Sequence, residues 1–345
     1  MGRLGMSVGD FGFFLIGATA VLLLAIQAVE HPSQFAQVLV FGLADGAIYA
    51  LVALGYTMVY GIIELINFAH GDVFMIGTFV TIIVFSLLGV TSTISNNWPL
   101  LIGVLLITAL AAMAFCGFLG VVIERVAYRP LRNAPRLAPL ITAIGISLIL
   151  EDLAKLRFGS SFVGVPSVFP NVQIHIGPVT IALLDVIVFV VAVILMAALQ
   201  ILITRTKTGR AMRSVAQDRD AASLMGVDVD RTIVITFFLG GALAGAAGLI
   251  YGLEIKQTVF YVGFQIGLVA FTAAVLGGIG NIPGAMLGGM VLGLLEAFAA
   301  SYLSILTDGA FGAEYKDVFA FLALIVILIF RPKGLLGEKV REEGA

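Results

Sequence analysis

Apolar residues are grouped along the chain in long runs with short polar stretches between them, and this pattern predicts the elements of the fold. Most runs approach the ~20 residues that a helix needs to cross the hydrocarbon core of a bilayer, so each is predicted to be a transmembrane or partial helix. Ten segments cover residues 11–29, 36–60, 72–90, 99–123, 138–156, 180–204, 232–253, 263–279, 284–303 and 317–330. The eighth and tenth are short, and we expect them to be half-helices, tilted or re-entrant.

The composition agrees with this pattern. The chain is 60% hydrophobic and 12% charged, whereas soluble domains carry about 25% charged residues. We therefore predict an all-α polytopic membrane protein with about eight to ten transmembrane or partial helices and no soluble domain. One domain is expected over 1–345, divided into an N-terminal span (1–33), a core (34–337) and a tail (338–345). The run at 11–29 is expected to be a retained span, because no small-residue cleavage site follows it.

Lysine and arginine residues predict the orientation, because they are retained on the cytoplasmic side of a membrane protein. Placing both termini in the cytoplasm leaves fifteen of the 19 Lys and Arg residues on that side. The other four are Lys155, Arg157, Lys256 and Lys316. The net charge of −2 gives no indication of a nucleic-acid partner.

A charged stretch at 205–231 interrupts the apolar pattern and lies on the predicted cytoplasmic side. A connector between two spans needs only a handful of residues, but this stretch carries ten charged ones. Asp218 or Asp220 is placed to cap a helix that begins near Ala221, and Gly226 is placed to end it. The stretch predicts a short helix–turn–helix on the cytoplasmic face. Docking of another protein is one interpretation, and binding of anionic lipid headgroups is the alternative.

Two other features concern the organisation of the core. The external segment at 158–178 contains three prolines, so we expect an irregular cap there. The segments 55–77 and 277–293 each join two spans through a glycine-containing turn with an Asn. These segments predict either an internal repeat of broken helices, as in many transporters, or chance similarity among glycine-rich spans.

Several long motifs resemble one family. GRAMRSVAQDRDAASLMGVDVDR resembles the cytoplasmic coupling loop of permeases in bacterial ABC importers of the branched-chain amino acid (LivH) type. GYTMVYGIIELINFAHGDVFMIG is similar to the family's N-terminal signature and FTAAVLGGIGNIPGAMLGG to its C-terminal one. The resemblance extends from about Gln34 to Gly337.

The resemblance implies a permease subunit in a bacterial inner membrane that passes branched-chain or other neutral amino acids into the cytoplasm. It also implies a second homologous permease, two cytoplasmic ATPase subunits and an external substrate-binding protein as partners. No stretch of the sequence reads G-x-x-x-x-G-K-[ST], so this chain is not expected to be an enzyme. No cofactor is expected in this chain, because ATP and Mg²⁺ belong to the partner ATPases.

The residues expected to dock on the ATPase offer small, apolar and charged side chains along the loop. They are Gly209, Arg210, Arg213, Ala216, Asp218, Ala221, Ala222, Leu224 and Gly226.

Polar residues in or near the spans are the candidates for the transport pathway, because such groups face a cavity or another helix. They are Asp45, Glu64, Asn67, His70, Asp72, Glu151, Asp152, Lys155, Asp185, Asn281 and Glu296. Among them, Asn67, His70, Asp72 and Asn281 are the candidates for a gate or pathway. Capping of helix ends by Asn67 or Asp72 is the favoured structural interpretation.

Three further expectations concern individual candidates. An ion pair between Glu151 and Lys155 is expected because they are four residues apart on one helix. Asp185 is expected to be reached by water at the outer end of its span. No metal site is expected, because the chain contains only three histidines and none lies in a ligand cluster.

Two other functions fit parts of the pattern. A urea or short-amide ABC permease shares these motifs. A secondary transporter driven by an ion gradient would favour carboxylates deep in the spans and would not need the charged loop.

Overall fold

The computed structural model describes residues 26–94, 97–132, 134–135, 137–177, 179–331 and 333–337. Within them, seven helices are long and apolar enough to cross a membrane. Their elements are α2 (Pro32–Ile63), α3 (His70–Leu87), α4 (Trp98–Ile123, continued by a π-helical turn, Glu124–Tyr128, and a 3-10 turn, Arg129–Leu131), α5 (Leu137–Phe158), α6 (Leu183–Arg205), α9 (Val229–Ile255) and α11 (Ile282–Leu306). The polytopic all-α prediction is confirmed, although the predicted span at 11–29 lies almost entirely outside the described residues.

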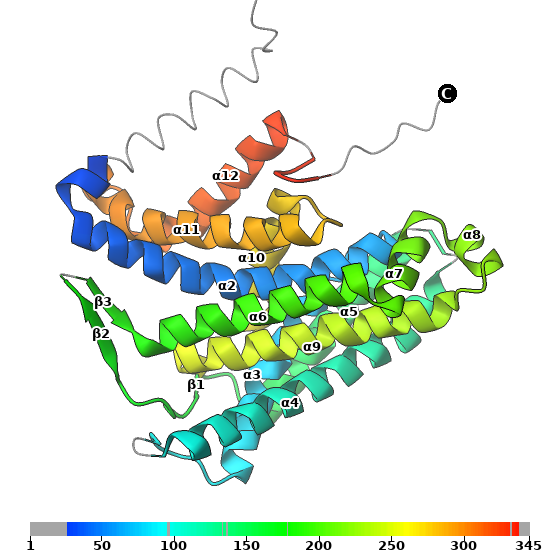
Figure 1. Cartoon of the computed structure of the whole chain (residues 1–345), viewed down its shortest axis with the longest axis horizontal. Coiled ribbons are helices and arrows are strands. Elements are labelled where there is room, and N and C mark those ends of the chain that lie inside the picture. The colour runs from blue at the N-terminus through cyan, green and yellow to red at the C-terminus, as the bar shows by residue number, and fades with distance from the viewer. Residues whose placement is uncertain are drawn as a thin grey trace, which may run out of the picture.

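Two apolar helices are shorter than the rest. They are α10 (Val262–Gly277) with 16 residues and α12 (Lys316–Phe330) with 15 residues. Both correspond to the segments predicted to be short. A 3-10 turn, Ala313–Tyr315, precedes α12, which diverges from the bundle in Figure 1.

Short strands occur in the segment that was predicted to be an irregular cap. β1 (Val163–Gly164) pairs with β4 (Gln257–Thr258), and β2 (Gln173–Ile176) forms an antiparallel hairpin with β3 (Val179–Ala182). The prediction of an irregular cap was therefore wrong in part. The β2–β3 hairpin and the charged loop, which forms α7 (Lys207–Gln217) and α8 (Arg219–Leu224), lie at opposite ends of the bundle (Figure 1).

The helices divide into a central and a peripheral group. In α2 and α9 more than 70% of the apolar window is buried, whereas in α4, α5 and α6 only about a third or less is buried. The peripheral helices expose large apolar side chains, as a lipid-facing surface requires. Leu110 of α4, Ile141 of α5 and Ile194 of α6 are examples.

Glycines allow the central helices to approach closely, which is how membrane helices pack without a hydrophobic driving force. Gly46 of α2 lies against Gly293 of α11, and Gly77 of α3 lies against Gly245 of α9. A Cβ at any of these positions would overlap with the facing backbone. The single cysteine, Cys116, is buried in the contact between α4 and α9, where its Sγ donates to the carbonyl of Val73.

The two similar segments noted in the sequence form two helical hairpins, α2–α3 and α10–α11. They pack crosswise, with α2 on α11 and α3 on α10. This arrangement is what a two-fold internal repeat would produce.

The glycine contact gives a first prediction. Gly293→Val would place a branched side chain against the backbone of α2, and overpacking of this kind costs about 1–3 kcal/mol. We expect a lower unfolding temperature in detergent. Gly103→Val is the matched control, because a Cβ at Gly103 of α4 meets nothing within 4 Å. Equal unfolding temperatures for the two variants would contradict the proposed packing.

Candidate functional site

The charged loop is built from short capped helices. Thr206 Oγ1 accepts from Gly209 N at the start of α7, and Asp218 Oδ1 accepts from Ala221 N, 2.9 Å away, at the start of α8. Gly226 follows α8 with φ +83°, a conformation that glycine adopts without strain. Asp228 then caps α9 through Arg231 N. The predicted helix–turn–helix is confirmed, with Asp218 rather than Asp220 as the cap.

One side of α7 is fixed to the end of α6. Gly209, Met212 and Val215 are buried, and a Cβ at Gly209 would overlap with the carbonyl oxygen of Ile203. The Arg213 guanidinium donates to that same carbonyl, which lies in the last turn of α6. Cations are favoured at helix C-termini, so this contact joins the loop firmly to α6.

α8 is fixed to a second helix. Arg219 Nη2 donates to the carbonyl of Ile62, in the last turn of α2, at 3.0 Å. Ala222 is 4% exposed and packs into the same core. The loop is therefore held to the C-terminal ends of two spans, α6 and α2, at once.

The opposite side of the loop is exposed. Leu224 and Met225 are 87% and 84% exposed, which is unusual for large apolar side chains outside a lipid-facing surface. The remaining exposed candidates are Arg210, Ala216, Asp218, Ala221 and Gly226. Of the nine residues selected from the sequence, Gly209 and Ala222 face the chain itself, and Arg213 is bonded to it.

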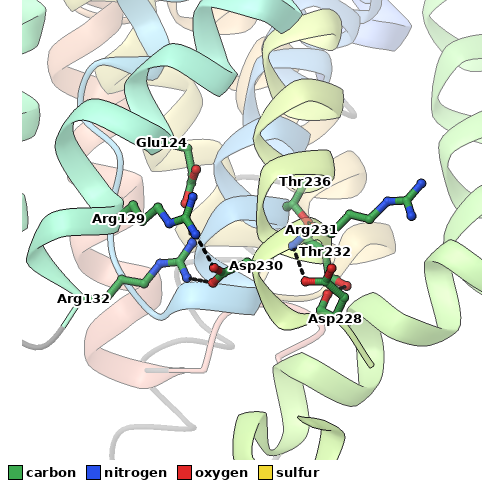
Figure 2. Close-up of polar contacts among 8 residues, drawn as sticks. All are labelled: Glu124, Arg129, Arg132, Asp228, Asp230, Arg231, Thr232 and Thr236. Carbon is green, nitrogen blue, oxygen red and sulfur yellow. Dashed lines mark hydrogen bonds and ion pairs between the residues drawn. The ribbon is translucent and has the colours of Figure 1, made fainter. Parts of the chain in front are cut away.

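A second polar cluster lies at the same end of the bundle, where α4 ends and α9 begins. Figure 2 shows Arg129 and Arg132 converging on the carboxylate of Asp230. Arg132 also pairs with Glu124, whose side chain is fully buried. These arginines were read in the sequence only as orientation signals, because their partner lies about a hundred residues further along the chain.

The candidates near the start of α3 are buried. Asn67, His70 and Asp72 are 3%, 2% and 0% exposed. The expected capping role is wrong for the N-cap position of α3, which is occupied by residue 69 and makes no side-chain cap hydrogen bond. Instead, Tyr128 OH donates to Asn67 Oδ1, 3.3 Å away, and Ser147 Oγ donates to Asp72 Oδ2.

Asn281 has a capping role at the turn between α10 and α11. Its Oδ1 accepts from Gly284 N at 3.0 Å, and its Nδ2 donates to the carbonyl of Leu336 at 2.8 Å. The C-terminal segment adds backbone hydrogen bonds from Leu335 and Leu336 to the end of α10. Asn281 thus ties this turn to the chain that follows α12.

Two expectations about other polar residues are wrong. Lys155 lies over the ring of Phe260, 5.3 Å from its centroid, and no ion pair joins it to Glu151 among the described residues. Asp185 is 3% exposed rather than wetted, and its carboxyl group interacts with that of Glu254 of α9. Spacing along one helix did not reveal these partners on neighbouring elements.

Seven long apolar helices in one bundle, with a structured loop at one end, have the architecture of a multi-pass membrane protein. The family model for the branched-chain amino acid transport system permease component matches residues 38–328. The chain belongs to this family, and it is therefore a permease subunit of an ABC importer located in the inner membrane.

Curated relatives match nearly the whole chain. The high-affinity branched-chain amino acid transport system permease proteins LivH of Salmonella typhimurium and Escherichia coli K12 are each 44% identical, over 90% of this chain and 97% of their own length. BraD of Pseudomonas aeruginosa is 43% identical over 88% of this chain and 96% of its own length. These relatives are named as permeases rather than enzymes. No solved structure matches the chain.

The ion-pair cluster gives a second prediction. Arg132→Met leaves the buried Glu124 carboxylate without its cation, and breaking a buried pair in this way costs about 3–5 kcal/mol. Arg129→Met is the matched control: its pair with Asp230 is half exposed, and such pairs contribute about 0–1 kcal/mol. Thermal unfolding in detergent should separate the two variants clearly, and the double variant Glu124→Gln/Arg132→Met should recover much of the loss. Equal unfolding temperatures for Arg132→Met and Arg129→Met would contradict the role of Arg132.

Proposed function

We propose that this chain forms part of the membrane pathway of an importer that brings branched-chain amino acids into the cytoplasm. The near full-length similarity to proteins named for this transport supports the substrate class. ATP and Mg²⁺ would be bound by two cytoplasmic ATPase subunits, since the sequence contains no P-loop motif. A second homologous permease and an external substrate-binding protein would complete the assembly.

The orientation follows the distribution of charge. The arginines at the end of α4, those of the charged loop and Arg331 after α12 belong to segments that lead to one end of the bundle, which we assign to the cytoplasm. Both termini would then be cytoplasmic. The β2–β3 hairpin would face the external binding protein.

Coupling to ATP hydrolysis would occur through the charged loop. The observation that carries this proposal is the contrast between its two sides: Leu224 and Met225 are exposed, whereas Arg213 and Arg219 are bonded to the ends of α6 and α2. An ATPase surface that binds the exposed pair would displace α6 and α2 as it closes. Residues Arg210, Ala216, Asp218 and Ala221 would complete the docking surface.

We place the inner gate between this loop and the start of α3, where Asn67 and His70 lie. A cavity of about 290 Å³ opens between the segment after α2, the end of α4 and the α7–α8 turn, and Glu64, Tyr128 and Arg219 are among its lining residues. Movement of the loop would change the shape of this cavity directly. Asn281 would hold the neighbouring α10–α11 turn in place.

The exposed pair gives a third prediction. The double variant Leu224→Asp/Met225→Asp should lose copurification with the ATPase subunits and reduce ATP-driven leucine uptake in proteoliposomes at least tenfold, because two apolar contacts are replaced by charges. Leu156→Asp is the matched control, because Leu156 is 84% exposed near the C-terminal end of α5, away from the loop. This variant should keep both the copurification with the ATPase subunits and the leucine uptake.

Normal uptake by the double variant would contradict the docking surface. Uptake by the unmodified protein that persists without ATP and stops with an ionophore would contradict the importer itself and support a secondary transporter.

Gly226 gives a fourth prediction. Its φ of +83° suits glycine, is tolerated by asparagine and is disfavoured for a β-branched residue. Gly226→Val should therefore distort the tip of the loop and lower uptake several-fold more than it lowers ATP hydrolysis. Gly226→Asn should keep uptake within about twofold of the unmodified protein, since asparagine adopts this conformation readily. Equal uptake by the two variants would show that the backbone at Gly226 has no role in coupling.

A further inference from the structure

Two helices begin within the bundle rather than at one of its ends. His70, the first residue of α3, packs against Gly55 and Tyr56 of α2. Gly55 lies eight residues before the C-terminal end of α2, which corresponds to about 12 Å along the helix axis. α3 therefore begins beside the interior of α2 and not at its end.

The start of α10 lies at the same depth and faces the start of α3. Gly71 packs against Gly263 and Gly267, and a Cβ at Gly263 would overlap with Asp72. The two helices then run apart. α3 runs toward the external side, where Thr78 bonds Thr258 of β4, and α10 runs toward the α10–α11 turn on the cytoplasmic side.

The N-cap residues of these two starts are Ala69 and Tyr261, and neither makes a side-chain cap hydrogen bond. The first N–H of each helix instead donates to a nearby carbonyl, His70 N to Asn67 O and Val262 N to Val259 O, and the Tyr56 hydroxyl interacts with the N–H of Gly71. The start of a helix still carries the partial positive charge of the helix dipole. Two such ends meet inside the bundle, an arrangement that binds anionic groups in other transporters.

A carboxylate without a cation stands at this junction. Asp72 is 0% exposed; Ser147 donates to its Oδ2, but its Oδ1 has no hydrogen-bond partner and faces Gly263. Glu296 provides the contrast. It is also buried and bonded by a hydroxyl group, that of Tyr49, but Lys316 lies 3.6 Å from it. Ionisable groups at membrane depth are costly and mark sites of function.

We propose that the junction of α3 and α10 binds the zwitterionic head group of an amino acid in transit. The carboxylate of the ligand would face the positive ends of the two helix dipoles, and its ammonium group would bind Asp72 Oδ1. This proposal rests on the proposed import function and adds its recognition site. A neutral amide would leave the Asp72 carboxylate unpaired, so the site selects for a ligand that carries both charges.

The glycine contact explains how the site can be closed in this conformation. Gly71, Gly263 and Gly267 allow the two helices to touch, and no side chain separates their backbones. Parting of α10 from α3 would expose the helix starts and Asp72 together. Return of the two helices to contact would expel the ligand.

The test uses a diazirine-bearing leucine analogue as the probe. The complete importer in proteoliposomes is illuminated during ATP-driven uptake, and the labelled peptides are identified by mass spectrometry. We expect the labelled residues to lie in α2, α3 or α10, within about one helical turn of Asp72. This labelling should require both the binding protein and ATP. Asp72→Asn should reduce this labelling at least tenfold, whereas Glu296→Gln, the matched buried carboxyl, should leave it within about twofold.

The outcomes separate the two proposals. Labelling that requires neither ATP nor the binding protein would overturn the import function. Labelling that requires both but maps to other helices in the unmodified chain would overturn the Asp72 site and leave the import function standing. Unchanged labelling in Asp72→Asn would also overturn the site. The positions labelled in the unmodified chain test the site by themselves, so the experiment remains decisive even if the Asp72→Asn variant fails to assemble.

Discussion

The structure depends on one constraint: hydrocarbon offers no hydrogen-bond partners, so the chain itself must satisfy every helix end that water does not reach. At the C-terminal ends of α6 and α2 this is done by arginines, with Arg213 bonded to Ile203 and Arg219 bonded to Ile62. Both arginines come from the same loop. The requirement for satisfied carbonyls thereby creates a mechanical connection, and any force on the loop is transmitted to the backbone of two spans.

The same constraint makes the middle of the bundle unusual. The side chains of Asp218 and Asp228 cap α8 and α9, whereas the N-cap residues of α3 and α10 make no side-chain cap hydrogen bond. Glycines bring these two starts into contact, and the buried carboxyl group of Asp72 lies beside them. At these positions the backbones of the two helices touch directly.

The hydrophobic periodicity and the capping and turn residues predicted those features of the fold that depend on residues close together in the chain. The spans, the two short helices, the Asp218 cap and the turn at Gly226 follow from residues within a few positions of one another. The partners that were missed lie far away along the chain: Asp72 with Ser147, Arg219 with Ile62, and Arg132 with Asp230. The capping role expected for Asn67 and Asp72 failed because their side chains reach across to α4 and α5. β1 was missed because its partner, β4, lies beyond α9; the β2–β3 hairpin was missed although its two strands are close together in the chain.

The last described residues are held against the α10–α11 turn. Leu335 and Leu336 donate backbone hydrogen bonds to the end of α10, and Asn281 donates one to Leu336. This has a practical consequence for anyone handling the protein. An affinity tag or fluorescent fusion that displaced Leu335 and Leu336 would remove these hydrogen bonds from the end of α10. A spacer between Gly337 and any such tag keeps the contact intact.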